Sequence, residues 1–486
     1  MRKKSLICVL LCGLGITLEA QNRLDVYPAP EGVEMKDDFT VKVRVPGGEW
    51  QDVPTYMVKV DEVRGTKHCV EKSSMSYFDF EGQVEVSVTS NNGPIETARV
   101  RPLSYGIEPA VEGSTLTFSL DRPRNISVEV NGDIFHNLQL FANPIDVNNP
   151  IDGVKITSAK QLAKKRKDVI YFGPGVHDLG KDTVYVASGQ TVYVAGGAVV
   201  YGLIHADSVQ DVKIYGRGVI MQKGRGEGVR VSSSRNVEID GLISTQCPVG
   251  ESDGVKVTNV KVVSSYGWGD GLNVFASSNV HYDGCFARTS DDCTTIYATR
   301  LGYVGSCRNI VTENCALWAD VAHPIMIGLH GNVENPDTIE NIVYRNIDIL
   351  DHKEKQIDYQ GCIAINAGDL NIVRNCLFED IRIEDFRQGA LVHMKVTFNK
   401  KYCAAPGRGI EDVTFRNIYY NGSGEGYSVI VGYDEGHKIK NVLFENLVIN
   451  GEVISDDMPG KPAWYKTGDM AGFIVGEHVE NLRFIK

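Results

Sequence analysis

The order of hydrophobic and polar positions divides the chain into two parts with different repeat lengths. The first part, from residue 25 to about 150, contains short alternating runs such as "DFTVKVRV" from Asp38, "QVEVSVTS" from Gln83 and "ISVEVNG" from Ile126. Alternation with a period of two is typical of strands with one buried face, and turn sequences such as "PGG" and "NNG" separate the runs. We therefore expect an antiparallel, immunoglobulin-like β-sandwich over residues 21–150.

A longer repeat begins after a segment rich in Pro and Asn between Pro144 and Gly153, where we expect the domain boundary. From about residue 165 onward, the motif x-N-V-x-hydrophobic-x-N/D/G recurs with a period of roughly 20 to 32 residues. Copies include "SRNVEIDG" from Ser234, "SSNVHYDG" from Ser277 and "IKNVLFENLVI" from Ile439. Val, Ile, Tyr and Phe dominate and helical spacing is almost absent, so the sequence predicts an all-β solenoid, a right-handed parallel β-helix, over residues 151–486.

The asparagine that recurs in each copy of the motif has a structural explanation. Asn tolerates the left-handed backbone of a tight turn and can bond to its own chain. Because successive coils of a β-helix lie about 4.8 Å apart, the asparagines are expected to form an internal ladder. They are therefore not candidates for catalysis.

The first twenty residues, 1–20, have the pattern of a secretory signal peptide. Three basic residues at positions 2–4 precede the apolar run "LICVLLCGLGI", and "LEA" forms a small-residue cleavage site before Gln21. The protein is therefore expected to be exported to the periplasm or the extracellular space. Lipoprotein processing at Cys12 is a disfavoured alternative because Leu11 stands where a small residue is expected. No later run is long and apolar enough to predict a membrane span.

The charge of the chain limits its partners. The sequence has 62 acidic and 50 basic residues and a formal net charge of −12, and loss of the leader removes three positive charges and one negative to give −14. Such a surface repels polyanions at long range, so nucleic acid and anionic membranes are not expected partners, although a local basic cleft could still hold an acidic polymer. We expect a monomer that binds a polysaccharide or oligosaccharide.

Nine of the eleven cysteines remain after removal of the leader. An odd number leaves at least one thiol unpaired in a monomer, and the sequence has no CxxC pair and no zinc-type spacing. We expect most cysteines to be small core residues, with one or two disulfides in an oxidising compartment. No metal and no cofactor are expected.

One stretch, "GWGDGLNVFASSNVHYDGCFARTSDDCTTIY" from Gly267 to Tyr297, carries candidate chemistry. Asp270 is followed twenty-one residues later by the adjacent pair Asp291 and Asp292. This spacing is about one coil of a β-helix, so the three carboxylates are expected on one side of the same groove. In a regular strand the adjacent pair would point to opposite faces, so both reach the groove only if the backbone bends there.

Three carboxylates that converge in a cleft resist simultaneous ionisation, which raises at least one pKa toward neutrality. One group then acts as an acid and another as a base, which is the division that glycoside hydrolysis requires. A calcium site is the other use of clustered carboxylates, as in β-helix lyases. The sequence shows no Lys or Arg base at a matching coil position, which ranks a polysaccharide lyase lower. A non-catalytic carbohydrate-binding β-helix would show the same repeat.

The same residues resemble those of a known enzyme family. "WGDG" at 268–271 and "DDC" at 291–293 resemble the Asn-Thr-Asp-Gly and Asp-Asp signatures of polygalacturonases, glycoside hydrolase family 28. "AHPIMIG" at 322–328 resembles the Gly-His-Gly-Leu-Ser-Ile-Gly segment of that family. The resemblance implies a hydrolase of pectin-type polysaccharide that inverts the anomeric carbon.

The resemblance also implies roles for four residues. Asp291 would be the general acid, and Asp270 and Asp292 would hold the attacking water. His323 would tune or orient the acid. The sequence departs from the family pattern in that an insertion lengthens the spacing before His323 and Ala322 replaces a Gly.

The Arg-Ile-Lys segment that grips the uronate carboxylate in family 28 has no clear counterpart. "IRIED" at 381–385 begins like it but has Glu384 where Lys is expected, and Lys395 in "HMK" is a weak substitute. A second resemblance competes, because "ALWADVAHPIMIGLHG" from Ala316 and the N-terminal sandwich are similar to the dextranases and isopullulanases of family 49, which cut neutral glucans. The sugar, its linkage and endo or exo action stay open.

Further candidates for substrate binding lie near the carboxylates or at turns of later coils. Trp268 is expected to be a stacking platform for a sugar ring. The remaining candidates are Asn273, His330, Asn332, Asn366, Asp369 and Lys395. The glycine-rich "GRGEGVR" at 224–230 lacks the Lys-Ser/Thr of a phosphate-binding loop and is interpreted as an ordinary loop.

Overall fold

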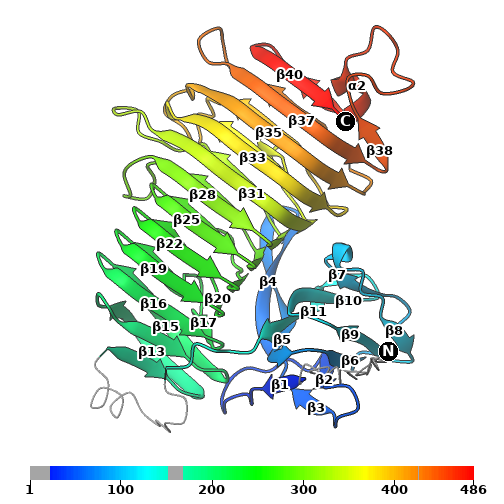
Figure 1. Cartoon of the computed structure of the whole chain (residues 1–486), viewed down its shortest axis with the longest axis vertical. Helices are drawn as coiled ribbons and strands as arrows, with labels where there is room; N and C mark the ends of the chain where they lie inside the picture. Colours follow the sequence, from blue (N-terminus) through cyan, green and yellow to red (C-terminus); the bar gives the residue numbers. More distant parts are fainter. Residues whose placement is uncertain (1–21, 151–167, 425) are drawn as a thin grey trace, which may run out of the picture.

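The computed structural model describes residues 22–150, 168–424 and 426–486 (Figure 1). The expected signal peptide, residues 1–20, and the expected start of the second domain at residue 151 lie outside the described residues. In the described part, none of the helices combines the length and the apolar character that a membrane span requires.

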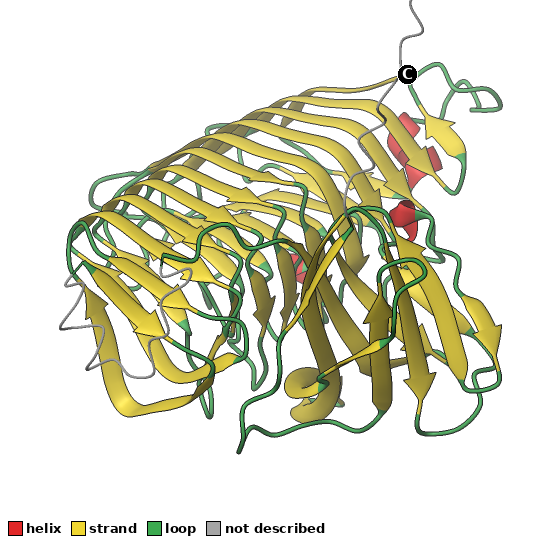
Figure 2. Cartoon of the chain, turned by 60° about the horizontal axis from the view of Figure 1, so that its bottom comes forward, coloured by secondary structure: helices red, strands yellow, loops and turns green. Residues whose placement is uncertain are grey.

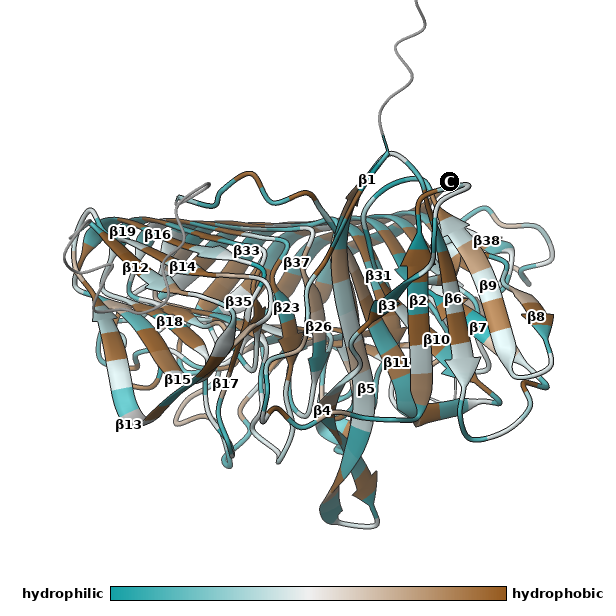
Figure 3. Ribbon diagram, turned by 90° about the horizontal axis from the view of Figure 1, so that it is seen from below, coloured by the Kyte–Doolittle hydropathy of each residue, from teal (hydrophilic) through white to brown (hydrophobic). Residues whose placement is uncertain are grey.

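The N-terminal part consists of two small sheets whose facing side chains form one apolar core that includes Val41, Val86 and Ile126. Burial alternates along the strands as predicted from the period of two, and Figure 3 shows this alternation in colour. Neighbouring strands are antiparallel except for one parallel pair, β5 with β11. The first sheet contains β1 (Arg23–Val26), β4 (Tyr56–Arg64), β5 (Lys67–Glu81), β7 (Ala98–Arg101), β10 (Arg124–Val130) and β11 (Asp133–Pro144). The second contains β2 (Phe39–Arg44), β3 (Gln51–Val53), β6 (Val84–Ser90), β8 (Ala110–Glu112) and β9 (Thr115–Leu120).

The rest of the chain is a parallel β-helix, which confirms the predicted solenoid (Figures 1 and 2). Three columns of stacked parallel strands surround one continuous core of inward-pointing Val, Ile, Leu and Phe side chains. The first column contains β12 (Val169–Phe172), β14 (Thr191–Val194), β16 (Gln210–Gly216), β19 (Arg235–Asp240), β22 (Asp253–Thr258), β25 (Ser278–Asp283), β28 (Cys307–Glu313), β31 (Thr338–Asp351), β33 (Ile372–Ile383), β35 (Gly409–Tyr420), β37 (Ile439–Ile449) and β40 (Val479–Ile485).

The second and third columns complete each coil. The second contains β13 (Gly175–Val186), β15 (Ala198–Asp207), β17 (Val219–Met221), β20 (Ile243–Ser244), β23 (Lys261–Val263), β26 (Phe286–Thr289) and β29 (Ala316–Ala319), which pairs with the end of β31. The third contains β18 (Val229–Ser232), β21 (Val249–Gly250), β24 (Leu272–Phe275), β27 (Thr294–Tyr297), β30 (Ile325–Gly328), β32 (Ile363–Ala367), β34 (Val392–Val396), β36 (Ser428–Val431) and β39 (Phe473–Val475). The remaining elements are η1 (Leu103–Tyr105), η2 (Ile357–Tyr359), β38 (Glu452–Ile454) and α2 (Thr467–Ala471).

The repeated asparagines form the expected ladder, but they do so on the outer surface and not inside the solenoid. Asn341 is exposed, and its side-chain amide donates to Asn309 at 3.0 Å and accepts from the Asn375 amide at 3.1 Å. Its φ of +59° places it in the left-handed region. The side chain therefore points outward from the strand, while the hydrophobic residues beside it in the motif point inward.

The sandwich packs on the outer face of the second column of the solenoid. Tyr56, Met75 and Tyr77 of the sandwich form one apolar cluster with Val263 and Phe286 of the second column. Burial of such a cluster stabilises the contact by roughly 1.5–3 kcal/mol for each large side chain. The two parts are therefore joined by a continuous apolar core.

A buried ionic contact makes this interface specific for one arrangement of the two parts. The Arg288 side chain, fully buried, donates to Asp320 at 2.9 Å and to the Asn137 side chain of the sandwich at 2.8 Å. Its guanidinium also lies 4.3 Å from the ring centroid of Trp318, which is fully buried and so belongs to the core. Because a buried charge without a partner is costly, these bonds favour one relative placement of the sandwich and the solenoid.

The cysteines of the described part are all free, so the expected disulfides are absent there. Eight of the nine are buried, as predicted for small core residues, and Cys69 is partly exposed. The stacked coils use thiols such as Cys285 and Cys315 to fill the interior, where Leu242, Val260 and Ile347 stand in neighbouring coils.

Substitution of Asn341 tests the ladder. Asn341→Ala should lower the free energy of unfolding by about 1–2 kcal/mol, because Ala in the left-handed region is strained by that amount and both ladder bonds are lost. Asn341→Gly loses the same bonds without the backbone strain, so we expect its melting temperature to lie between those of Asn341→Ala and the wild type. Thermal unfolding followed by circular dichroism measures this order, and an alanine variant as stable as the glycine variant would contradict it.

Candidate active site

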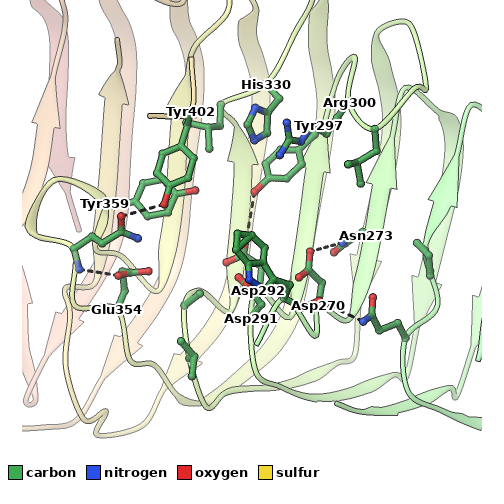
Figure 4. A pocket seen from close by; sticks show the side chains of 18 of the residues that line it. Asp270, Asn273, Asp291, Asp292, Tyr297, Arg300, His330, Glu354, Tyr359 and Tyr402 are labelled. Carbon is green, nitrogen blue, oxygen red and sulfur yellow. Dashed lines mark hydrogen bonds between the residues drawn. The ribbon is translucent and has the colours of Figure 1, made fainter. Parts of the chain in front are cut away.

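A cavity of about 710 Å³ opens where the chain passes from the second column to the third (Figure 4). This volume lies within the ordinary range of ligand-binding sites. Loops of six successive coils form most of the wall, and the hairpin of β4 and β5 from the sandwich completes it. The wall includes Arg225, Glu227, Arg230, Gln246, Trp268, Asp270, Asn273, Phe275, Asp291, Asp292, Tyr297, Arg300, His330, Lys353, Glu354, Lys355, Gln356, Tyr359, Lys401 and Tyr402.

The register of the third column aligns three of the predicted residues. Leu272 of β24 pairs with Thr294 of β27, which pairs with Ile325 of β30. Two positions earlier in each coil stand Asp270, Asp292 and His323. Asp270 therefore stacks in register with Asp292 and not with Asp291, and the insertion before His323 lengthens a loop without disturbing the stack.

The backbone bends between β26 and β27, as the sequence required if both adjacent aspartates were to reach the groove. Residues 290, 291 and 293 form this bend, and the Asp291 carboxyl accepts the backbone N–H of Asp292 at 3.0 Å. Asp291 and Asp292 therefore both line the cavity with Asp270. Figure 4 shows the three carboxyl groups close together at its centre.

Asp292 is held by three donors. Its Oδ1 accepts from the His323 backbone N–H at 3.1 Å and faces His323 Nδ1 at 2.7 Å, and its Oδ2 accepts from the Tyr297 hydroxyl at 3.2 Å. Hydrogen bonds of this kind favour the charged form of a carboxylate. Asp292 is therefore suited to act as a base.

His323 lies behind Asp292, fully buried and outside the cavity wall. Its Nε2 donates to the carbonyl oxygen of Tyr359 at 2.5 Å, and a carbonyl can only accept, so both ring nitrogens carry protons when Nδ1 donates to Asp292. Burial opposes this positive charge, but the Asp292 carboxylate and its hydrogen bond raise the pKa of His323 above its usual value. The resemblance implied that His323 tunes or orients the acid Asp291, and in the structure the hydrogen bond of its Nδ1 is to Asp292, because the register places the ring there.

The other two carboxyl groups retain protons more strongly than ordinary aspartates. Burial, followed by the neighbouring Asp292, raises the pKa of Asp270 from 3.8 to about 7. Burial and the charges of Asp270 and Asp292 raise the pKa of Asp291 well above its usual value. The cavity therefore contains two carboxyl groups with raised pKa values beside Asp292, which is the effect that crowding of three carboxyl groups produces.

Three more predicted residues line the same cavity. Trp268 is 67% exposed and offers its ring, with the Arg225 guanidinium 5.6 Å from its centroid. The Asn273 side chain donates to Asp270 at 2.6 Å. The ring of His330 packs edge-on against Tyr297, and burial and Arg300 lower the pKa of His330 to about 4, so its ring is neutral.

Four predicted residues are not part of the cavity wall, because each is engaged elsewhere. Asn332 caps a turn with its side-chain oxygen, which accepts two backbone N–H groups. Asn366 is buried and bonds to His393 Nδ1 at 2.8 Å. Asp369 accepts the backbone N–H of Ala404 at 2.5 Å, and Lys395 is ion-paired with Asp358. The structure therefore separates these four from the carboxylates.

The segment at 381–385 also lies elsewhere. Arg382 is paired with Asp348 at 2.6 Å, and Glu384 accepts from Arg101 of the sandwich at 2.6 Å. This segment serves the interface with the sandwich, so it does not replace the carboxylate-gripping residues of family 28.

Sequence reasoning missed the basic residues of the cavity. Six Lys and Arg side chains line it from four separate segments: Arg225, Arg230, Arg300, Lys353, Lys355 and Lys401. The loop at 224–230 contributes two of them, although its sequence showed no known motif. These residues are far apart in the chain and follow no shared spacing, so only the folded coils bring them together.

The wall also contains a buried carboxylate and two stacked aromatic rings that the sequence did not single out. Glu354 is buried and accepts the backbone N–H of Gln356 at 2.7 Å. Tyr359 and Tyr402 stack with ring centroids 5.4 Å apart. These residues lie in loops that interrupt the sequence repeat, so the repeat could not identify them.

A possible metal-binding group lies away from the cavity. Among the described residues, one set of His, Asp and Glu side chains has ligand atoms within 4.8 Å of one another: His281, Asp283 and Glu313 of the first column. His281 Nε2 is already 2.9 Å from Glu313, and Asp283 accepts from Asn314 at 2.7 Å. The cavity carboxylates do not form such a group with each other in the described part.

Comparison with known proteins gives the relationships of the chain. The model of the family described as glycosyl hydrolases family 28 matches residues 183–459, more than half of the chain. No curated protein sequence matches. Among solved structures, Dex49A from Penicillium minioluteum is 13% identical with a TM-score of 0.58 over 95% of this chain and 96% of that chain. At this identity the likeness is one of fold, and it extends over the sandwich and the solenoid.

Two exopolygalacturonases are more distant in structure. The family 28 exopolygalacturonase of Yersinia enterocolitica is 12% identical with a TM-score of 0.48 over 83% of this chain and 96% of that chain. The hyperthermoactive exopolygalacturonase of Thermotoga maritima is 14% identical with a TM-score of 0.46 over 61% of this chain and 87% of that chain.

The raised pKa of Asp270 predicts a pH-dependent gain in stability for Asp270→Asn. Between pH 4 and 7 the unfolded chain loses this proton while the folded chain keeps it, so the stability of the wild type falls as the pH rises through this window. Asn does not ionise, so the melting temperature of Asp270→Asn should exceed that of the wild type at pH 8 and approach it at pH 4. Differential scanning calorimetry at both pH values measures this, with the exposed Glu31→Gln as control. A difference that does not change with pH would refute the prediction.

Proposed function

This chain belongs to family 28 of the glycosyl hydrolases and is a glycoside hydrolase of polysaccharides, and on this premise we propose that its substrate is an acidic, pectin-type polymer that it cleaves with inversion. The proposal concerns the sugar, the stereochemistry and the residues. The residues of the cavity support the choice of sugar and the catalytic roles, and the inversion follows from the resemblance to family 28.

The charge of the cavity wall supports a uronate substrate most directly. The chain as a whole carries a formal charge of −12, yet six Lys and Arg side chains gather around the three aspartates. In the described part, Arg225 and Arg300 have no ion pair with a carboxylate. A cation without a partner in a partly enclosed site attracts an anionic ligand, and guanidinium groups match the geometry of a carboxylate.

Asp291 is assigned as the general acid. Burial and the other two carboxyl groups raise its pKa well above the usual value, which suits it to hold the proton that an acid donates. Its proton passes to the glycosidic oxygen as the bond from that oxygen to the anomeric carbon breaks. The leaving sugar therefore departs as a neutral alcohol.

Asp292 is assigned as the general base, with Asp270 beside it to hold the attacking water. Asp292 takes one proton from the water, and the oxygen attacks the anomeric carbon from the face opposite the leaving group. This attack inverts the configuration. His323 does not reach the substrate; it acts as a positioning residue that fixes the orientation and charge of Asp292 through the 2.7 Å bond.

A neutral glucan is the second candidate substrate. The exposed face of Trp268 and the stacked rings of Tyr359 and Tyr402 at the same cavity suit the apolar faces of any sugar. These rings favour carbohydrate without selecting an acidic one. The basic residues are what distinguish the two candidates.

Replacement of the acid tests the mechanism. Asp291→Asn should lower kcat by roughly 10²–10⁴-fold on the polymer that the wild type cleaves, since Asn cannot donate the proton. The exposed Asp207→Asn is the control, and circular dichroism should show the same fold for both variants. An Asp291→Asn variant with wild-type kcat would exclude the assignment.

The products of the wild type distinguish the classes of activity in the same assay. NMR should show the first product with the anomeric configuration opposite to that of the cleaved bond. Ultraviolet absorbance from an unsaturated product would identify a lyase instead. Binding of the polymer without any turnover would identify a carbohydrate-binding protein.

Removal of the basic residues tests the substrate. Arg225→Gln and Arg300→Gln should each raise KM for polygalacturonate by about tenfold, equivalent to roughly 1.4 kcal/mol of lost binding. Exposed Arg235 on the outer strand β19 supplies the control Arg235→Gln, which should leave KM unchanged. Kinetics on polygalacturonate, its methyl ester and dextran measure the effect. Faster cleavage of dextran than of polygalacturonate by the wild type would overturn the acidic substrate.

A further inference from the structure

The hairpin formed by β4 and β5 belongs to the sandwich, yet its tip forms part of the cavity wall. Val63, Gly65, Thr66 and His68 line the same cavity as the three aspartates. These residues lie more than one hundred positions before the region matched by the family model, residues 183–459. Figure 3 shows the hairpin projecting beyond the other strands of the sandwich.

Asp61 joins the hairpin to the loop that precedes Asp270. Its side chain is fully buried, and its Oδ2 accepts the backbone N–H of Gly267 at 3.0 Å and faces His68 Nδ1 at 2.9 Å. The other oxygen, Oδ1, has no hydrogen-bond partner among the described residues. Burial of a carboxylate costs free energy unless hydrogen bonds compensate, so the two contacts of Asp61 are needed to hold it at this junction.

The loop held by Asp61 is strained. Tyr266, Gly267 and Trp268 have φ values of +78°, +66° and +50°. A left-handed conformation costs roughly 1–2 kcal/mol for each residue other than Gly, so contacts from outside must fix this loop. The hairpin supplies them, because Asp61 holds Gly267 and the Lys59 ammonium lies 5.4 Å from the ring centroid of Tyr266.

The ring of His68 packs directly on this loop. A Cβ on Gly267 would lie 3.0 Å from His68 Nε2, closer than an ordinary contact, so the ring and the loop touch at this position. Three residues farther along the chain stands Asp270. The hairpin therefore fixes the stacking ring of Trp268 and the start of the catalytic strand together.

The opposite side of the cavity also holds the hairpin tip. The Lys353 ammonium donates to the Val63 carbonyl at 3.2 Å, and Lys355 donates to the Gly65 carbonyl. These lysines flank Glu354, which lines the cavity. The hairpin thus spans the cavity between the Trp268 loop and the coil that carries Glu354.

His68 presents a free ring nitrogen at the cavity. Its side chain is 42% exposed, and Nδ1 is occupied by Asp61. The Asp61 carboxylate can only accept, so Nδ1 carries the proton of this contact and Nε2 is the ring nitrogen left for another partner. Nε2 has no hydrogen-bond partner among the described residues, so it is available for a hydrogen bond to a sugar hydroxyl.

We propose that this hairpin is a wall of the substrate-binding site, in which Asp61 positions the Trp268 loop and His68 forms a hydrogen bond with a substrate hydroxyl. The proposal rests on the glycoside hydrolase function above but not on the identity of the sugar. It makes the sandwich a working part of the active site.

The contact of His68 with substrate is tested by kinetics on the glycan that the wild type cleaves. His68→Ala should raise KM about tenfold with kcat changed less than twofold. His136→Ala is a closely matched control, because His136 has the same Nδ1 distance of 2.9 Å to a carboxylate, Asp133, and a similar exposure of 43%, but lies outside the cavity wall. Equal KM values for the two variants overturn this part of the proposal.

The role of Asp61 is tested without substrate by hydrogen exchange. In Asp61→Ala the amide of Gly267 should exchange at least about tenfold faster than in the wild type, while amides of the outer strand β25 are unchanged. Unchanged exchange at Gly267 overturns the positioning role. This measurement is independent of turnover, so it separates failure of the proposal from failure of the hydrolase function, which would show as an inactive wild type.

Asp61→Asn serves where Asp61→Ala does not fold. Gly267 and His68 both meet the same oxygen of Asp61, so Asn can keep both contacts by placing its side-chain oxygen there, but a neutral amide accepts more weakly than a carboxylate. The Gly267 amide should therefore exchange faster in Asp61→Asn than in the wild type, and KM should rise. Wild-type exchange at Gly267 in Asp61→Asn would overturn the positioning role.

Discussion

The parallel register between successive coils is the constraint on which the rest of this structure depends. Each strand of the third column bonds to the strands before and after it, so one position recurs at the same angle in every coil. Asp270, Asp292 and His323 occupy one such position in three consecutive coils. The backbone ladder therefore sets the separation of the catalytic groups, and the loops between strands vary in length without disturbing it.

Crowding gives these stacked groups different protonation states. Asp292 receives donors from His323 and Tyr297, whereas Asp291 receives only a backbone N–H and retains its proton more strongly. The same burial that would destabilise a lone charge here produces an acid and a base side by side. The bond from His323, enclosed behind Asp292, is one of the contacts that distinguish Asp292 from Asp291.

Much of the fold and the centre of the site could be predicted from the sequence. Alternation with a period of two and the long repeat are local signals, because a strand that buries one face must alternate and a solenoid must repeat. They gave the sandwich and the β-helix. The spacing of Asp270 from Asp291 and Asp292 gave the carboxylate cluster and the backbone bend, since both follow from the length of one coil. The spacing did not reveal which aspartate shares the register of His323, so its bond to Asp292 is seen only in the structure.

By itself, then, the sequence determined the periodic elements and the groups placed by their period. The tertiary structure alone decided which residues that do not follow the repeat reach the cavity. These are the basic side chains of four separate segments and the hairpin that carries Asp61 and His68. It also removed Asn332, Asn366 and others from the site by engaging them in turns and buried bonds. The physical reason is that a repeat fixes positions along one axis, whereas loops and a docked domain are placed by side-chain packing and buried charge, which no spacing along the chain encodes.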